Sequence, residues 1–189
     1  MQKIKPWLIP VLGGVAITML AAGILYAMGR PPICTCGTIE LFHWQVNTSG
    51  DSQHVFDPYS FTHVLHGIIL FAALHVFARK IPLRYRFLLA ISFEAGWEVL
   101  ENTSLVIERY RAATFSLGYY GDSILNSIGD IISMLGGFWI ASKLRLWQSI
   151  AVVCLIELLL LYLIRDNLTI NLIMLAYPIE AIKQWQLQK

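Results

Sequence analysis

Charged side chains are scarce in this sequence. Only 14% of its 189 residues are Asp, Glu, Lys or Arg, whereas an average soluble domain carries about 25%. This scarcity excludes an ordinary soluble globule and a disordered chain. The formal net charge of only +2 also excludes a nucleic-acid binder, because it gives no basic field that would attract a phosphate backbone.

Familiar catalytic motifs are missing as well. The sequence has no Ser or Cys nucleophile in a recognisable elbow motif and no glycine-rich phosphate-binding loop. It also has no internal repeat and no low-complexity segment. The informative features are therefore the long apolar runs and the polar residues placed inside them.

Hydrophobic residues make up 57% of the chain and are concentrated in long runs. A helix that crosses a bilayer needs about 20 mostly apolar residues. The first run is too long for the apolar core of a signal peptide, so we expect it to be a retained helix. The sequence predicts one all-α polytopic membrane domain over residues 1–189, with five transmembrane helices at about 7–28, 59–78, 87–107, 122–142 and 146–164.

The C-terminal segment, residues 168–185, has a different pattern. Leu168 to Tyr177 is apolar but too short to span comfortably, and Pro178 interrupts it. The residues that follow are amphipathic, with an interfacial Trp185. We expect a re-entrant or surface-lying helix here, and a tilted sixth transmembrane helix is the alternative.

Basic residues predict the orientation of the chain, because Lys and Arg are enriched in cytoplasmic loops. With five spans, all the basic clusters fall on one side: Lys3 and Lys5, then Arg79, Lys80, Arg84 and Arg86, then Lys143 and Arg145. We therefore expect a protein of the bacterial inner membrane with a cytoplasmic N-terminus. The 29–58 loop, which we expect to be structured, and the C-terminal segment would then be periplasmic.

The sequence contains three cysteines. Cys34 and Cys36 belong to the predicted periplasmic loop, where the oxidising compartment favours a disulfide or an inert pair over two thiolate metal ligands. Cys154 lies in the fifth predicted span and is interpreted as a small buried apolar residue.

Ionisable residues recur inside three of the predicted spans. Spacings of three, four, seven and eight residues place those of each span on one helix face. They are His63 and His66 in the second span, Glu94, Glu98 and Glu101 in the third, and Asp122, Asn126 and Asp130 in the fourth. An acid in hydrocarbon costs at least about 2.5 kcal/mol, so these acids cannot face lipid. We predict a shared polar cavity in the outer half of the membrane, lidded by the 29–58 loop; separate structural acid–base pairs are the alternative.

Three chemistries fit these residue types. His63 and His66, with Glu98 or Asp122, could bind a divalent metal such as zinc and activate water. The same four residues could instead act as metal-free catalytic acids and bases, since crowded carboxyls raise one another's pKa. The cavity could also bind a cation or a polar headgroup without any reaction.

Other polar residues are candidates for holding a substrate. Arg109, Arg111 and Arg165 would hold an anionic headgroup, because guanidinium groups bind such oxygens strongly. The remaining candidates for the substrate-binding surface are Glu94, Glu101, Asn126 and Asp130.

The order of the polar motifs resembles that of the bacterial membrane-protein family known as domain of unknown function 2585. The resemblance covers nearly the whole chain after the first span. It rests on the segments 29–30, 34–37, 52–54, 57–67, 94–102, 108–111, 120–130 and 165–171. The resemblance to this family does not imply any particular reaction.

More distantly, the layout is similar to that of VanZ-like membrane proteins. That pattern would be filled by Asp57 and His63, by Glu94 or Glu98, by Arg111, and by Asp122, Asn126 and Gly129. The resemblance implies a role in the cell envelope.

These observations predict an envelope protein whose outward-facing cavity binds, and hydrolyses or transfers a group on, a lipid-linked or amphiphilic molecule. The alternatives are a non-catalytic accessory or assembly subunit of a larger membrane complex, and an ion-binding or headgroup-binding protein. Proton transport is a weaker alternative, because Glu157 is the only acid on a path toward the inner side. The lipid bilayer is the expected partner in every case.

Overall fold

The computed structural model describes residues 6–188, which form helices and loops but no strand. The predicted all-α class is therefore confirmed for this range. The helices are α1 (Leu8–Ala27), α2 (Ser60–Phe77), α3 (Leu83–Glu101), α4 (Ser104–Ala113), α5 (Ile124–Ala141), α6 (Leu146–Ile164), α7 (Leu168–Ala176) and α8 (Glu180–Leu187).

Four helices, α1, α2, α5 and α6, are long and apolar enough to cross a membrane. Most apolar side chains of α6 are exposed, as expected for a surface that faces lipid rather than a protein core. The fifth long helix, α3, has 19 residues but also carries Arg84, Arg86 and three glutamates. Membrane association follows from the four apolar helices, whereas the count of five transmembrane helices stays a prediction.

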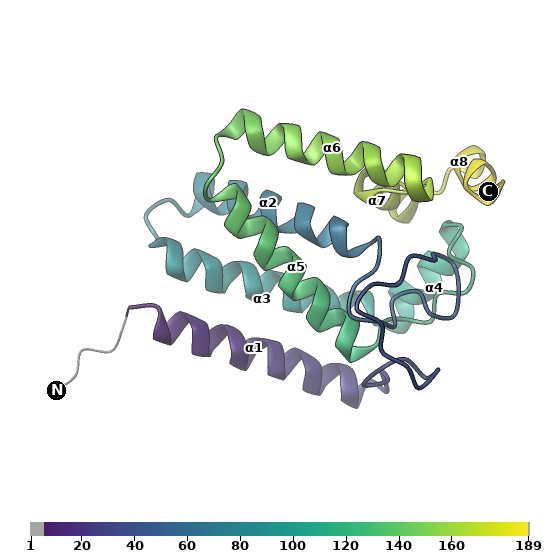
Figure 1. Ribbon diagram of the computed structural model, residues 1–189, viewed down its shortest axis with the longest axis horizontal. Coiled ribbons are helices and arrows are strands. Elements are labelled where there is room, and N and C mark those ends of the chain that lie inside the picture. Colours follow the sequence, from purple (N-terminus) through teal and green to yellow (C-terminus); the bar gives the residue numbers. More distant parts are fainter. Residues whose placement is uncertain (1–5, 189) are drawn as a thin grey trace.

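The long helices form a bundle with two dissimilar ends (Figure 1). The start of α1, the α2–α3 connection and the α5–α6 connection lie at one end, which we call the basic end because Arg79, Lys80 and Lys143 are exposed there. The 28–59 loop, α4, α7 and α8 lie at the other, which we call the polar end. Lys3 and Lys5 lie outside the described residues.

Helices α2 and α5 approach each other closely through glycines. A Cβ atom on Gly67 would lie 2.0 Å from the Met134 carbonyl oxygen, and one on Gly137 would lie 2.0 Å from that of Val64. Only glycine allows backbones to come this near. This contact places the polar residues of α2 directly beside those of α5.

The predicted third span is not one continuous helix. Helix α3 ends at Glu101, and the chain turns through Asn102 before α4 begins at Ser104. The Thr103 hydroxyl caps the new helix by accepting from the Val106 N–H, which stabilises a separate helix start. Only the last residues of the predicted range, 102–107, therefore lie beyond α3, in the turn and the start of α4 at the polar end.

The C-terminal segment contains two short helices. Helix α7 has nine residues and covers about 14 Å, roughly half of a bilayer core. Helix α7 is therefore too short to cross a bilayer by itself, and the placement of this segment relative to the membrane stays a prediction. The Glu157 carboxylate accepts hydrogen bonds from the Leu168 and Thr169 N–H groups, so it caps the start of α7.

The cysteines differ from one another in their surroundings. Cys34 and Cys36 are joined by a disulfide, so the alternative in which both supply thiolate metal ligands is not the state of this structure. Cys154 is exposed on α6, and its interpretation as a buried residue is wrong. A small apolar side chain on a lipid-facing helix meets no penalty for that exposure.

Candidate functional site

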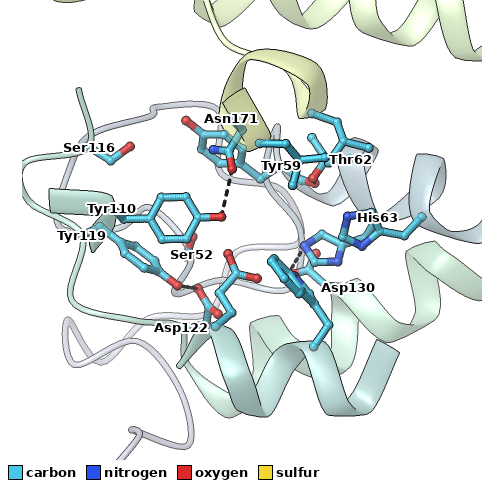
Figure 2. Close-up of a pocket in the computed structure, with 15 residues that line it drawn as sticks. Ser52, Tyr59, Thr62, His63, Tyr110, Ser116, Tyr119, Asp122, Asp130 and Asn171 are labelled. Carbon is cyan, nitrogen blue, oxygen red and sulfur yellow. Dashed lines mark hydrogen bonds and ion pairs between the residues drawn. The ribbon is translucent and has the colours of Figure 1, made fainter. Parts of the chain in front are cut away.

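A cavity of about 50 Å³ lies at the polar end, with room for a few water molecules or a hydrated ion (Figure 2). Helices α2, α3, α4, α5 and α7 all contribute to its wall. The polar lining includes His63 and His66 of α2, Glu101 of α3, Tyr110 of α4, Asp130 of α5 and Asn171 of α7. The predicted shared cavity thus has a counterpart in the structure.

His63 is the centre of the ionisable cluster. Its Nδ1 lies 2.6 Å from Glu94 Oε1 and 3.4 Å from Glu98 Oε1, and its Nε2 lies 3.8 Å from Asp130 Oδ2. The ring is buried, so these carboxylates act on it with little screening by solvent. One imidazole therefore connects carboxylates from α3 and α5.

His66 shares one of those carboxylates. Its Nδ1 lies 3.1 Å from Glu94 Oε1 and 3.3 Å from Glu94 Oε2. Glu94 is therefore bracketed by both imidazoles, one helical turn apart on α2. The two rings pack edge to face at 4.9 Å, and Trp97 packs against His66.

Glu98 is the least satisfied polar group of the cluster. Its side chain is completely buried, and neither carboxylate oxygen accepts a hydrogen bond from any described residue. Its closest base is His63. Neither Glu98 nor Glu94 lines the cavity, whereas Glu101, one turn further along the same face of α3, does. Ligand atoms of His63, Glu98 and Glu101 all lie within 4.8 Å of one another, as do those of His63, His66 and Glu94.

Asp130 is held from the start of α2. The Ser60 hydroxyl donates to Asp130 Oδ1 at 2.7 Å, and the same hydroxyl accepts from the Asp57 N–H. The other oxygen, Oδ2, faces His63. Asp130 therefore has one oxygen that is fixed by Ser60 and one that faces His63.

Asp122 lies outside this cluster, before the start of α5. Its Oδ2 accepts from Asn102 Nδ2 at 2.6 Å and its Oδ1 from the Tyr119 hydroxyl at 3.0 Å. Burial raises the pKa of Asp122 to about 6, although both donors oppose that shift. Asp122 lines the cavity but belongs to neither group with metal-ligand spacing. The predicted set of His63, His66, Glu98 and Asp122 is thus only partly brought together.

Asp57 and Asn126 hold the 28–59 loop in place. Asp57 accepts from the backbone N–H groups of Tyr59, Ser60 and Ser52, and burial raises its pKa. Asn126, which was predicted to bind substrate, donates to the His54 carbonyl oxygen at 3.0 Å and does not line the cavity. Both residues join the 28–59 loop to the helices.

The three predicted anion-binding arginines do not reach the cavity. Arg109 donates to the carbonyl oxygens of Leu175 and Ala176 at the end of α7. The guanidinium of Arg111 lies over the ring of Tyr120, and that of Arg165 lies over the ring of Trp185. Sequence position alone could not show these contacts, because each partner comes from another turn or helix.

The lid of the cavity is also different from the prediction. Tyr110 of α4 donates through its hydroxyl to Asn171 of α7 at 2.9 Å, so these two helices meet above the cavity (Figure 2). The 28–59 loop supplies only Ser52 and Tyr59 to the lining. The lid is therefore mainly helical.

Asp166 fixes this lid to α2 and α8. It accepts from the Tyr59 hydroxyl at 3.2 Å and from Gln186 Nε2 at 3.2 Å. Burial raises the pKa of Asp166 to about 6, and its hydrogen bonds oppose the shift. A carboxyl in this position links the C-terminal segment to the mouth of the cavity.

Several functional candidates were missed from the sequence: Ser60, Asn102, Tyr110, Tyr119 and Asn171. Most of them lie inside the polar motifs that carried the family resemblance, which was the available signal. The sequence did not single them out because they are neutral and lie in predicted loops or at helix ends. An acid inside an apolar run is unusual, whereas a neutral polar residue at such a position is not.

An apolar groove of about 550 Å³ lies beside this polar region. Its walls come from the loop residues 44–46 and 48, from Pro58 and Phe61, and from the C-terminal half of α6. Tyr59 and Thr62 line the polar cavity instead. The first turn of α2 thus separates a small polar cavity from a large apolar groove.

Comparison with known proteins shows that the chain is similar to one protein family. The sequence profile of the family described as "Protein of unknown function (DUF2585)" matches residues 25–188. The chain is 46% identical to a UPF0314 protein of Rhizobium johnstonii over 90% of this chain and 88% of that protein. It is 47% identical to a UPF0314 protein of Rhizobium meliloti over 95% of this chain and 90% of that protein. No solved structure matches the chain.

Proposed function

We propose that this chain, which belongs to the DUF2585 family, is an inner-membrane protein of the cell envelope that binds a divalent cation in its polar cavity. We further propose that it uses the cation to hydrolyse, or to transfer a group on, a lipid-linked or amphiphilic substrate. His63, Glu98 and Glu101 are the proposed cation ligands. The substrate would enter from the periplasmic side.

The observation that carries this proposal is the state of Glu98. A buried carboxylate that accepts no hydrogen bond is costly, and native proteins satisfy such groups with a proton, a base or a metal ion. Glu98 has both oxygens buried without a donor among the described residues. A cation held between Glu98, Glu101 and His63 would satisfy them, and these ligand atoms already lie within 4.8 Å of one another.

The other members of the cluster fit supporting roles. A metal-binding histidine usually donates its second ring N–H to a carboxylate, which fixes the orientation of the ring. Glu94 lies 2.6 Å from His63 Nδ1 and is suited to this role. The nitrogen left for the cation is then Nε2, which faces Asp130 Oδ2 at 3.8 Å, and the Glu98 oxygen that lies 3.4 Å from Nδ1 would have to turn toward it. Imidazole nitrogen together with carboxylate oxygen is a donor set that suits zinc and similar divalent ions. Such an ion would polarise a substrate oxygen or activate a bound water.

The apolar groove supports an amphiphilic substrate. An acyl or polyprenyl chain would lie against α6 in the groove of about 550 Å³, and the polar group would reach the cavity past the first turn of α2. Burial of apolar chain surface in the groove would contribute roughly 25 cal/mol per Å² to binding. Neither the cavity nor the groove alone would suit a molecule of this kind.

The topology of the proposal uses the two ends of the bundle. We place the basic end in the cytoplasm because Lys and Arg favour that side, and we take α3 as the fifth transmembrane helix. The polar end with its cavity then faces the periplasm. The distant resemblance to VanZ-like proteins supports the envelope role, and it stays a prediction.

The test is the metal content of the detergent-purified chain, prepared without chelators and measured by elemental mass spectrometry. We expect about one divalent ion per chain in the wild type and a loss of that ion in His63→Ala and in Glu98→Gln. His75→Ala is the matched control, because His75 is exposed in the last turn of α2, away from the cavity lining. It should keep the ion.

A wild-type protein with no stoichiometric metal would overturn the cation site. Acid–base chemistry without metal, or an assembly role in a larger complex, would then replace it. Equal metal in the wild type and in both cavity variants would likewise show that the ion binds elsewhere.

A further inference from the structure

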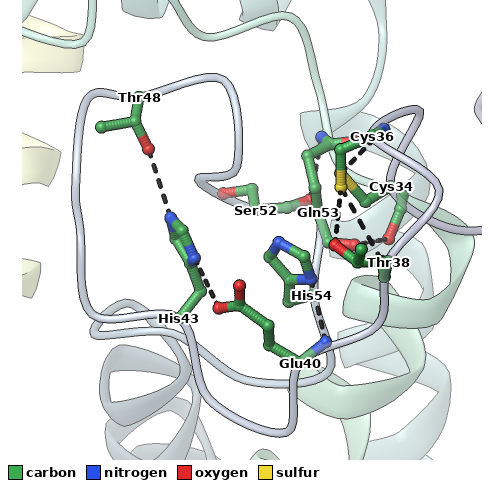
Figure 3. Close-up of a disulfide and its surroundings, with 10 residues drawn as sticks. Cys34, Cys36, Thr38, Glu40, His43, Thr48, Ser52, Gln53 and His54 are labelled. Atoms are coloured by element: carbon green, nitrogen blue, oxygen red, sulfur yellow. Dashed lines mark hydrogen bonds and ion pairs between the residues drawn. A yellow bond between two sulfur atoms is a disulfide. The ribbon is translucent and has the colours of Figure 1, made fainter.

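The disulfide of the 28–59 loop lies apart from the polar cavity and has features of a reactive site. Cys34 and Cys36 are separated by a single residue and joined through their sulfur atoms (Figure 3). Cys34 is 3% exposed, whereas Cys36 is exposed. One sulfur is therefore accessible to an external reagent and the other is not.

The two sulfurs also have different polar neighbours. The backbone N–H of Cys36 donates to Cys34 Sγ at 3.2 Å. Cys36 Sγ lies 3.2 Å from the Thr38 hydroxyl, which is itself on the exposed side of the loop. Each sulfur thus has a donor at 3.2 Å, the fixed backbone N–H at Cys34 and the rotatable Thr38 hydroxyl at Cys36. Access therefore assigns the roles: the exposed Cys36 is the sulfur that is attacked, and the buried Cys34, whose negative charge the backbone N–H stabilises, leaves as a thiolate.

A histidine lies beside the pair. A ring nitrogen of His54 and both sulfur atoms lie within 4.8 Å of one another, and Figure 3 shows the ring facing the disulfide from across the loop. His54 is buried, and its Nδ1 accepts the Glu40 N–H at 3.1 Å. An imidazole held in place next to a disulfide can hold the proton that a departing thiolate later takes up.

We propose that Cys34 and Cys36 form a thiol–disulfide exchange site that reacts with an external thiol. The external thiolate attacks the exposed Cys36 Sγ and forms a mixed disulfide with it. The Cys34–Cys36 bond breaks, and its electron pair leaves on Cys34 Sγ. A second external thiolate then attacks the mixed disulfide, which leaves the Cys34–Cys36 dithiol and one external disulfide. Two electrons pass from the external thiols to the chain, and the reverse reaction oxidises it again.

The asymmetry between the two sulfurs supplies the first test. On a Cys154→Ser background in the full chain in detergent, Cys34→Ser leaves only the exposed Cys36, and Cys36→Ser leaves only the buried Cys34. We expect glutathione disulfide to form a mixed disulfide with Cys36 roughly tenfold faster than with Cys34, because access limits such exchange. Equal rates, or faster reaction at Cys34, would overturn the assigned roles.

The second test uses the intact disulfide. The Cys154→Ser chain is equilibrated with mixtures of reduced and oxidised glutathione and, in a parallel series, with a reduced dithiol protein such as thioredoxin. Free thiols are then trapped by alkylation and counted by intact mass. Reversible opening that follows the thiol ratio supports the site, and the faster of the two reagents identifies a small thiol or a protein thiol as the natural kind of partner. A disulfide that stays closed in the folded chain with both reagents would overturn the proposal.

The role of His54 is tested by the pH dependence of the opening rate. The titratable groups beside His54 are His43, whose ring stacks on it at 4.8 Å, and Glu40, which contacts both histidines. We expect His54→Ala to slow opening several-fold and to change the pH profile, whereas the remote His75→Ala leaves both unchanged. Identical profiles in the two variants would remove His54 from the exchange site.

Discussion

The polar end contains two sets of buried carboxylates that look alike in the sequence and differ in the structure. The anchored carboxylates, Asp57 and Asp166, each accept several hydrogen bonds, including bonds from backbone N–H groups. The second set comprises Glu98 and Asp130, which we call the cavity carboxylates because both face His63, although only Asp130 lines the cavity itself. They accept none and one hydrogen bond, respectively, from the described residues.

This difference separates a structural role from a functional one. A carboxylate whose oxygens are occupied by N–H and O–H donors has little capacity left for a ligand. One with free oxygens, in contrast, is stabilised only when something else approaches it. Burial alone does not distinguish them, because members of both sets are almost completely buried.

The largest expected loss of stability comes from removing one of the anchored carboxylates. Asp57→Ala leaves three backbone N–H groups without their acceptor, those of Tyr59 and Ser60 at the start of α2 and that of Ser52 in the 28–59 loop. We expect a loss of about 3 kcal/mol or more in the free energy of unfolding, since each buried donor without a partner costs about 1–3 kcal/mol.

Glu98→Gln is the matched variant from the other set. It gives up no hydrogen bond and removes a buried charge, so the metal-free protein should keep its stability. Urea unfolding in mild detergent, followed by circular dichroism, measures both variants. If Glu98→Gln unfolded as easily as Asp57→Ala, the division into two sets would be incorrect.

The next effect concerns how the cavity carboxylates are positioned. Gly67→Ala would place a methyl group 2.0 Å from the Met134 carbonyl oxygen and force α5 away from α2. We expect a loss of about 1–3 kcal/mol, as is typical of overpacking. We also expect weaker metal binding, because Asp130 and His63 lie on opposite sides of this contact.

Gly96→Ala controls for the change of glycine itself. No atom lies within 4 Å of a Cβ at Gly96, and alanine favours helix by about 1 kcal/mol over glycine. This variant should be as stable as the wild type or more so, in the same unfolding assay. A destabilised Gly96→Ala together with a normal Gly67→Ala would contradict the packing of α2 on α5.

An effect that depends on pH tests the anchored set. The pKa of Asp166 is about 6 in the folded chain, against an ordinary value of 3.8, so the folded state favours the protonated carboxyl. Its contribution to stability is fully present below about pH 4 and is lost as the pH rises through 6. Asp166→Asn should therefore gain stability relative to the wild type between pH 4 and 7, by about 3 kcal/mol.

Thermal unfolding of both proteins across this pH range measures the difference. Glu180→Gln, an exposed carboxylate on the neighbouring α8, serves as the control and should run parallel to the wild type. A constant difference between Asp166→Asn and the wild type at every pH would show that Asp166 has an ordinary pKa.

The smallest effect lies outside both sets. Arg109→Ala removes donors to the last carbonyl oxygens of α7. We expect a loss of about 0.5–1 kcal/mol, because interactions of cations with a helix C-terminus are typically of this size. Metal content should not change, since Arg109 does not line the cavity. If Arg109→Ala lost its metal but kept normal stability, Arg109 would have to contribute to the metal site.

The sequence by itself determined the class of this protein and the chemistry available to it. Long apolar runs can only be satisfied as helices in a bilayer, because the backbone must pair internally there, and four such helices are present. Acids and histidines at helical spacing cannot face lipid, so they had to meet one another. His63, His66, Glu94 and Glu98 do so.

Only the tertiary structure decided which polar groups are occupied and which are free. Hydrogen bonds between Asn126 of α5 and the 28–59 loop, or between Asn102 and Asp122, join residues that are far apart in the chain. The break between α3 and α4 turned Tyr110 over the cavity and Arg109 away from it. Spacing along a helix predicts which residues share a face, but the donors that reach that face come from other elements, and their positions depend on how the helices pack.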